Sequence, residues 1–163
     1  MERTLMLLPF PRTAFLAATL MLAGANPLFA ALGAPAADIQ REGQVAAPLG
    51  HQLVQVPQGV QQQTVLTSQN VTVTEYSSGG IVFAVRWEGP VIPDQQLLLG
   101  TYFPEYASAM QTHTSMGRNA PVQLHTPKLV VHMQGHMRAY TGTAYAPALV
   151  PNGVSLSALG IDP

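Results

Sequence analysis

The segment 71–87 constrains the fold most strongly, because it carries the pattern of a β-hairpin. Two runs rich in β-branched and aromatic residues, 71–76 and 81–87, flank the sequence Ser-Ser-Gly-Gly. A cluster of this kind between two strand-forming runs is the usual signal for a tight antiparallel turn. Side chains along a strand alternate between its two faces, so the second run is predicted to turn one apolar face to the core. The members of that face are Ile81, Phe83, Val85 and Trp87.

A second hairpin is predicted near the C-terminal end. Segment 128–134 is rich in apolar and β-branched residues and predicts a strand, and segment 137–145 predicts its antiparallel partner. Gly135 and His136 lie between the two and predict a turn or a bulge. Segment 61–76 also predicts extended chain with an internal turn, because it is rich in Thr and Val.

One main helix is predicted between the two hairpins. Pro93 fits the first turn of a helix, and Asp94 complements the positive end of the helix dipole. Pro104 kinks this helix or restarts it. Segment 112–127 has no strong period, which predicts a long loop or a loop with an irregular strand. We therefore predict an α+β fold, in which an antiparallel sheet of about four to six strands, built from two hairpins, carries one main helix packed on it.

The first 30 residues have the features of a secretion signal. Arg3 and Arg12 supply positive charge ahead of an apolar run at 15–23, and small residues follow that run. Two cleavage points fit the small-residue rule, after Ala25 and after Ala30. The second is favoured because it lies at a more usual distance from the apolar run.

An uncleaved membrane anchor is the alternative for this segment. The apolar run 14–25 is too short to span a bilayer comfortably, so the cleaved form is favoured. The expected location is then periplasmic or secreted, with no transmembrane span after signal cleavage. The expected organisation is a signal peptide at 1–30, a flexible leader at 31–50, a single α+β domain at 51–150 and a short, flexible C-terminal tail at 151–163.

Composition narrows the range of partners. Only 9% of the residues are charged, and the chain contains no cysteine. Without residues 1–30 it keeps five basic and seven acidic residues, a net charge of −2 with His neutral. The lack of a basic stripe argues against nucleic acid as a partner. The lack of cysteine excludes a disulfide framework and thiol chemistry.

Three stretches carry a resemblance to a known family. They are GIVFAVRWEGP at 80–90, LLLGTYF at 97–103 and GHMRAYTG at 135–142. Over residues 73–151 the chain resembles a family of uncharacterised exported proteins of Gram-negative bacteria, a domain of unknown function. The sequence Ala-Leu-Gly at 31–33 also resembles the mature start of that family, which supports cleavage after Ala30. The resemblance implies an exported domain and brings no activity, substrate or cofactor with it.

The turn of the second hairpin is the candidate ligand site, because loops that hairpins position often carry binding groups. The structural alternative is an ion pair of Arg138 with Glu75, Glu88 or Asp94, and it is favoured over the binding role. The candidate ligand-binding residues are Gly135, His136, Arg138 and Tyr140.

Histidines are the candidate metal ligands. His132 and His136 would share one face of a helix and could bind Zn²⁺ there. The surrounding residues predict a strand, on which four residues span about 13 Å, too far for one ion to bridge. His113 and His125 could approach from the preceding loop. The metal alternative therefore rests on His125, His132 and His136, while hydrogen-bonded or solvated histidines are favoured and no cofactor is expected.

These observations favour a non-catalytic envelope module that binds a protein, a peptide or a glycan. No nucleophile elbow or phosphate-binding loop is present in the sequence, so an enzyme is the less favoured class. The alternative is a small periplasmic hydrolase or a metal-dependent enzyme. The histidines that would serve it are His113, His125, His132 and His136.

Overall fold

The computed structural model describes residues 31–36, 56–112 and 121–161. No helix in this part of the chain is long and apolar enough to cross a membrane. The two α-helices are α1 (Gln95–Leu99) and α2 (Phe103–Thr112), and the short 3-10 turns are η2 (Gly100–Tyr102), η3 (Pro147–Leu149) and η4 (Ser157–Leu159). The six strands are β1 (Gln61–Leu66), β2 (Thr72–Ser78), β3 (Ile81–Gly89), β4 (Val122–His125), β5 (Val130–His136) and β6 (Ala139–Tyr145).

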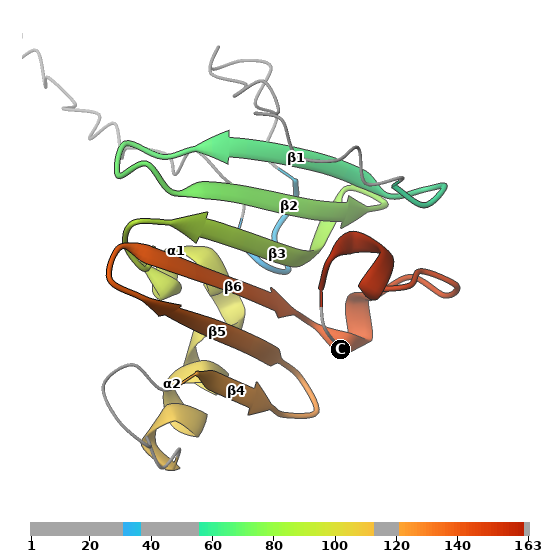
Figure 1. Ribbon diagram of the computed structural model, residues 1–163. Helices are drawn as coiled ribbons and strands as arrows, with labels where there is room; N and C mark the ends of the chain where they lie inside the picture. Colours follow the sequence, from blue (N-terminus) through green and yellow to red (C-terminus); the bar gives the residue numbers. More distant parts are fainter. Residues whose placement is uncertain (1–30, 37–55, 113–120, 162–163) are drawn as a thin grey trace, which may run out of the picture.

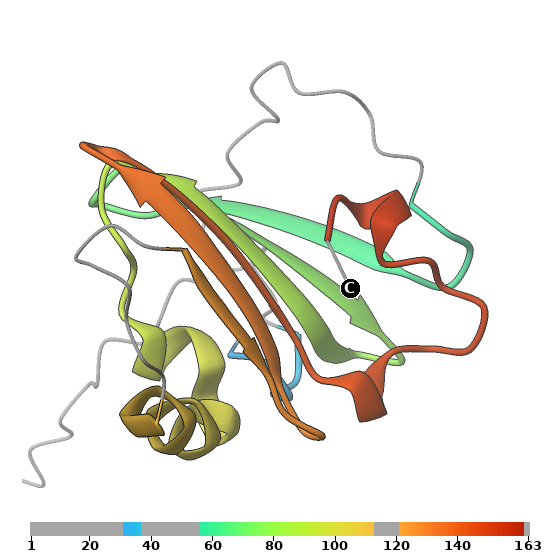
Figure 2. The same cartoon turned by 60° about the horizontal axis from the view of Figure 1, so that its bottom comes forward.

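All six strands form one antiparallel sheet in the order β1-β2-β3-β6-β5-β4 (Figure 1). Two three-stranded halves, each made of consecutive strands, meet where β3 pairs with β6. The helices α1 and α2 lie on one face, and the segment after β6 lies on the other (Figure 2). This confirms the predicted α+β fold with one main helical segment. Segment 112–127 also contains a strand, β4, which agrees with the second of the two predicted alternatives, a loop with an irregular strand.

The first predicted hairpin is confirmed, but its second strand contains a bulge. Gly79 and Gly80 form the two-residue turn with φ of 59° and 79°, which suits the twist of the flanking strands. Tyr76 pairs with Ala84 whereas Ser77 pairs with Val82, so Phe83 is the extra residue. A bulge of this kind reverses the alternation of side chains on either side of it.

The predicted common face of Ile81, Phe83, Val85 and Trp87 is therefore wrong. Val85 and Trp87 belong to the core on the helix side of the sheet. Phe83 packs in a second cluster on the opposite side, and Ile81 stays 36% exposed. The bulge is the physical reason, because it changes the phase of the strand between Val82 and Ala84.

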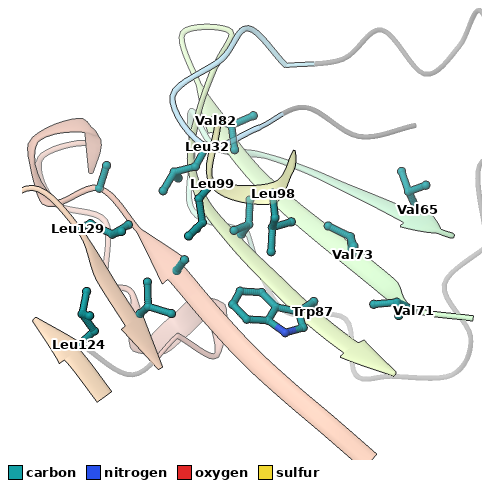
Figure 3. Close-up of a cluster of buried hydrophobic side chains, with 14 residues drawn as sticks. Leu32, Val65, Val71, Val73, Val82, Trp87, Leu98, Leu99, Leu124 and Leu129 are labelled. Atoms are coloured by element: carbon teal, nitrogen blue, oxygen red, sulfur yellow. The ribbon is translucent and has the colours of Figure 1, made fainter. Parts of the chain in front are cut away.

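The helix-side core is centred on Trp87. Leu98 and Leu99 from α1 pack over the sheet near its indole ring, and all three side chains are fully buried (Figure 3). The ring lies against Gly142 of β6, where a Cβ atom would come within 2.2 Å of it. Only glycine at this position lets the two strands pair beneath the indole.

Asp94 and Pro104 mark where the two α-helices of the helical segment begin. The Asp94 carboxylate accepts hydrogen bonds from the backbone N–H groups of Gln96 (2.8 Å) and Leu97 (3.4 Å), which caps α1. The chain then tightens into η2 and restarts as α2, whose first turn contains Pro104. This confirms the prediction that Pro104 kinks or restarts the helix.

Residues 31–36 are docked on the domain, so the expected flexible leader is wrong for this part. Leu32 is fully buried in the helix-side core. Its N–H donates to the Leu98 carbonyl at 3.0 Å, and Val82 N–H donates to the Ala34 carbonyl at 3.0 Å. The segment thus joins the start of β3 to α1. Residues 37–55 lie outside the described residues.

The C-terminal segment is also packed, so the expectation of a flexible tail is wrong for 151–161. Leu159 and Ile161 are fully buried in the second cluster, against the sheet face opposite the helices. The hydroxyl of Tyr76 donates a hydrogen bond to the Leu159 carbonyl at 3.0 Å. Burial of these two side chains stabilises the segment by roughly 1.5–3 kcal/mol each.

Candidate functional site

The face of the sheet opposite the helices, here called the open face, carries a row of polar side chains. Cross-strand register places them side by side, because Thr74 pairs with Arg86, Arg86 with Thr143, Thr143 with His132, and His132 with Gln123. Each lies at the same level of its strand and on the same face. We call Thr74, Arg86, Thr143, His132 and Gln123 the polar row.

A second polar set runs parallel to the polar row. Thr72 pairs with Glu88, Glu88 with Thr141, and Thr141 with Gln134. The side chains of this set alternate with residues that face the helix-side core, such as Trp87 and Gly142. Two adjacent polar rows thus cover the part of the open face that the C-terminal segment leaves accessible.

A groove of about 340 Å³ lies over the part of these two rows that Arg86 and strands β6, β5 and β4 supply. That volume is at the lower end of the range for small-ligand sites. Amides, hydroxyls, an imidazole and a guanidinium line it, and no Phe, Tyr or Trp of the described residues does. The polar lining residues are Arg86, Gln123, His132, Gln134, Thr141 and Thr143, with Pro121, Val122, Met133, Gly142 and Gly160 beside them.

Arg86 is the cation of the groove. Its guanidinium lies 3.9 Å from a Glu88 carboxylate oxygen, and the two side chains are 41% and 52% exposed. A pair this exposed contributes at most about 1 kcal/mol, so the guanidinium remains available to another anion. Gly160 approaches closely, since a Cβ atom there would lie 2.7 Å from the guanidinium. The C-terminal segment therefore forms one wall beside Arg86.

Tyr76 lies at the covered end of the open face. Burial raises the pKa of its hydroxyl above the usual value, and the positive charge of Arg86 partly opposes this rise. The hydroxyl is consequently neutral at physiological pH and serves as a hydrogen-bond donor to Leu159. Tyr76 thus fixes the wall of the groove.

Two of the predicted metal ligands meet at the edge of the sheet. The Nε2 atoms of His125 in β4 and His132 in β5 are 2.7 Å apart, and their ring centroids are 4.8 Å apart. His136 lies at the opposite end of β5, where it pairs with Ala139. Within the described residues no group of three His, Cys, Asp or Glu side chains is placed to hold a metal ion. His113 lies outside the described residues.

Comparison with known proteins places the chain in a family. A family model described as a protein of unknown function, DUF2844, matches residues 28–159. The chain belongs to this family. No curated protein and no solved structure matches it. The match confirms the resemblance to a domain of unknown function over 73–151. It extends further at both ends, so the DUF2844 unit includes the docked residues 31–36 and the buried Leu159.

In this DUF2844 chain the predicted ligand-binding residues lie at the tip of the β5–β6 hairpin. Gly135 and His136 are strand residues, not the turn, because they pair with Tyr140 and Ala139. The turn is formed by Met137 and Arg138, whose φ angles are 30° and 67°. The prediction misplaced it because the sequence here lacks the glycine that usually marks such a turn.

The hairpin tip borders a second, more open hollow. Arg138 and Tyr140 line it together with the loop after β3, and Met137 beside them is 88% exposed. Gly135 faces no ligand space, since a Cβ atom there would lie 2.4 Å from the Ala139 carbonyl oxygen. Within the described residues Arg138 forms no ion pair, so none with Glu75, Glu88 or Asp94 is found.

Sequence reasoning missed the polar row of this DUF2844 protein. A signal for part of it exists, because Arg86 is the polar residue between the apolar Val85 and Trp87. Thr141 and Thr143 flank Gly142 in the same way. The row itself depends on the pairing of β3 with β6, which are separated by the whole helical segment, and no local pattern encodes that pairing.

Proposed function

We propose that this protein is a non-catalytic binding module and that the groove on the open face holds an extended, acidic peptide segment of a partner protein. The observation that carries the proposal is the alignment of the polar row with the second polar set across adjacent strands. The strands hold the backbone positions of these side chains at fixed spacing, so no loop has to be ordered when a ligand binds. Periplasmic or secreted location belongs to the same proposal.

The chemistry of the groove suits a peptide. Gln123 and Gln134 each carry a donor and an acceptor, as a peptide group does, and Thr141 and Thr143 add hydroxyls that serve as either. Arg86 presents a planar guanidinium that matches a carboxylate in a bidentate manner. An Asp or Glu side chain, or a C-terminal carboxylate, is the expected partner of Arg86.

The lining argues for a peptide over a glycan. A sugar ring has an apolar face, and aromatic side chains are the residues that supply a flat apolar surface with a polar edge. The described lining of the groove contains none. Tyr145, on the same face, is buried within the second cluster.

The arrangement around His132 supports a binding role. Nucleophilic catalysis requires a hydroxyl or thiol within hydrogen-bond reach of a base that a third group orients. The Nε2 atom of His132 is hydrogen-bonded to the Nε2 atom of His125 at 2.7 Å, so this nitrogen faces a second imidazole. Its register partners, Gln123 and Thr143, present an amide and a hydroxyl on strands.

Two matched arginine variants test the proposal. The protein from residue 31 onward is titrated, with EDTA present, against fluorescent hexapeptides that each contain one Asp or Glu, and binding is followed by anisotropy. We expect Arg86→Ala to weaken the best peptide about tenfold or more, because a hydrogen bond to a charged group contributes about 1.5–3 kcal/mol. Arg138→Ala changes the net charge equally but lies at the hairpin tip, so it should leave the affinity unchanged.

Other results would count against the proposal. Equal loss with both variants would show general charge attraction instead of a site. Loss of peptide affinity with Arg138→Ala alone would show that the peptide binds at the hairpin tip. Binding of neutral oligosaccharides, but of no peptide, would show that the ligand is a glycan and not a peptide.

A further inference from the structure

The two histidines at the β4–β5 edge have a geometry that goes beyond peptide binding. His125 is opposite Val130, and His132 is opposite Gln123, so the histidines are diagonal neighbours on the open face. Diagonal side chains of an antiparallel pair are within reach of each other when they are long enough. Here the rings converge until the Nε2 atoms share a hydrogen bond of 2.7 Å, so one of the two nitrogens carries a proton that a bound metal ion would displace.

The backbone holds this pair in place. A tight turn joins the two strands, and Thr126 closes it with two hydrogen bonds to Leu129. The Thr126 hydroxyl accepts from the Leu129 N–H at 3.0 Å, and the Thr126 backbone N–H donates to the Leu129 carbonyl at 2.9 Å. Leu124 and Val131, next to the histidines in sequence, are buried in the helix-side core. The histidines thus project from strands anchored on the other face, as a preorganised chelate requires.

We propose that His125 and His132 form a chelating site for Cu²⁺. Imidazole nitrogens bind divalent transition metals at about 2.0–2.1 Å. Two nitrogens 2.7 Å apart then subtend roughly 80–85° at the ion. This angle is close to the 90° between neighbouring ligands of a square-planar ion, which copper(II) prefers.

The remaining coordination positions are open to solvent or to a ligand. His125 is exposed, and no third His, Cys, Asp or Glu of the described residues joins the two histidines. Affinity among divalent first-row metals is highest for copper with nitrogen donors, so a two-nitrogen site favours Cu²⁺. Because His132 also lines the groove, the ion lies at its edge, where a ligand carboxylate can reach it.

Metal titration without any peptide tests this site. Cu²⁺ and, separately, Zn²⁺ are titrated calorimetrically into the protein from residue 31 onward, and the copper form is recorded by electron paramagnetic resonance. We expect one Cu²⁺ with hyperfine splitting from two nitrogens, and a weaker affinity for Zn²⁺. His125→Ala and His132→Ala should each lower the copper affinity about a hundredfold, because each converts a chelate into a single-ligand site.

His136→Ala is the matched control, since that exposed histidine lies at the other end of β5. It should leave the copper affinity unchanged. His132→Asn and a thermal unfolding curve for each variant separate metal loss from misfolding. Copper binding that survives both alanine variants, an equal loss with His136→Ala, or Zn²⁺ bound as tightly as Cu²⁺ would overturn the proposal. The peptide titration contains EDTA, so the two proposals fail independently.

Discussion

At the scale of single residues, Tyr76 joins the sheet to the end of the chain. Its ring is buried in the second cluster, and its hydroxyl donates to the Leu159 carbonyl. Leu159 is followed by Gly160, which packs against Arg86. One buried hydroxyl therefore holds the segment that shapes the groove, and the protonation state of that hydroxyl affects the site.

The raised pKa of Tyr76 gives a pH dependence with a definite sign. Between the unfolded pKa of about 10 and the higher folded pKa, the native state binds more protons than the unfolded state. The free energy of unfolding should therefore fall as the pH rises above about 10. Urea unfolding at pH 8 and pH 11 measures this loss.

Tyr76→Phe separates that contribution from the others. At pH 8 the variant should be destabilised by about 1 kcal/mol, the usual value of one internal hydrogen bond. Its loss of stability between pH 8 and pH 11 should be smaller than in the unaltered protein, yet not absent, because burial also raises the pKa of Tyr106 and Tyr145. An identical loss in both proteins would show that Tyr76 has no part in it.

At the scale of elements, the hairpins and the helix could be predicted because their signals are local. Gly79 and Gly80 mark one turn, and Asp94 marks the helix start through its own hydrogen bonds. The bulge at Phe83 could not be predicted, since it depends on how β3 pairs with β2. The turn at Met137 and Arg138 lacks the expected residue types.

The candidate site was less predictable than the elements. His125 and His132 were named as metal candidates, but their diagonal contact requires the register of β4 on β5. The position of Arg86 between the apolar Val85 and Trp87 indicates only that it points away from the core. Its place in a polar row requires the long-range pairing of β3 with β6.

The docked segment 31–36 leads to a prediction about processing. Leu32 is buried and hydrogen-bonded only two residues after Ala30, so a chain that starts at Ala31 keeps every contact of this segment. We expect mass spectrometry of the protein from a cell-envelope fraction to find Ala31 as its first residue. A first residue at position 26, or a full-length chain in the cytosolic fraction, would contradict export with cleavage after Ala30.

At the scale of the whole molecule, the sheet separates two unlike faces. The helix side is closed by α1, α2 and Leu32 around Trp87. The open face is partly covered by the C-terminal segment, and the rest carries the groove and the histidine pair. This asymmetry explains why β3, β5 and β6 alternate between core residues and polar residues, and it makes the open face the expected binding surface.

Backbone amide shifts in a ¹⁵N–¹H nuclear magnetic resonance titration test that claim most directly. An acidic hexapeptide is added to the labelled protein from residue 31 onward, with EDTA present. We expect the largest shifts in β4, β5 and β6 at Gln123, His132 and Thr143, with little change at Met137 and Arg138. The largest shifts at Met137 and Arg138, with none along the polar row, would contradict it.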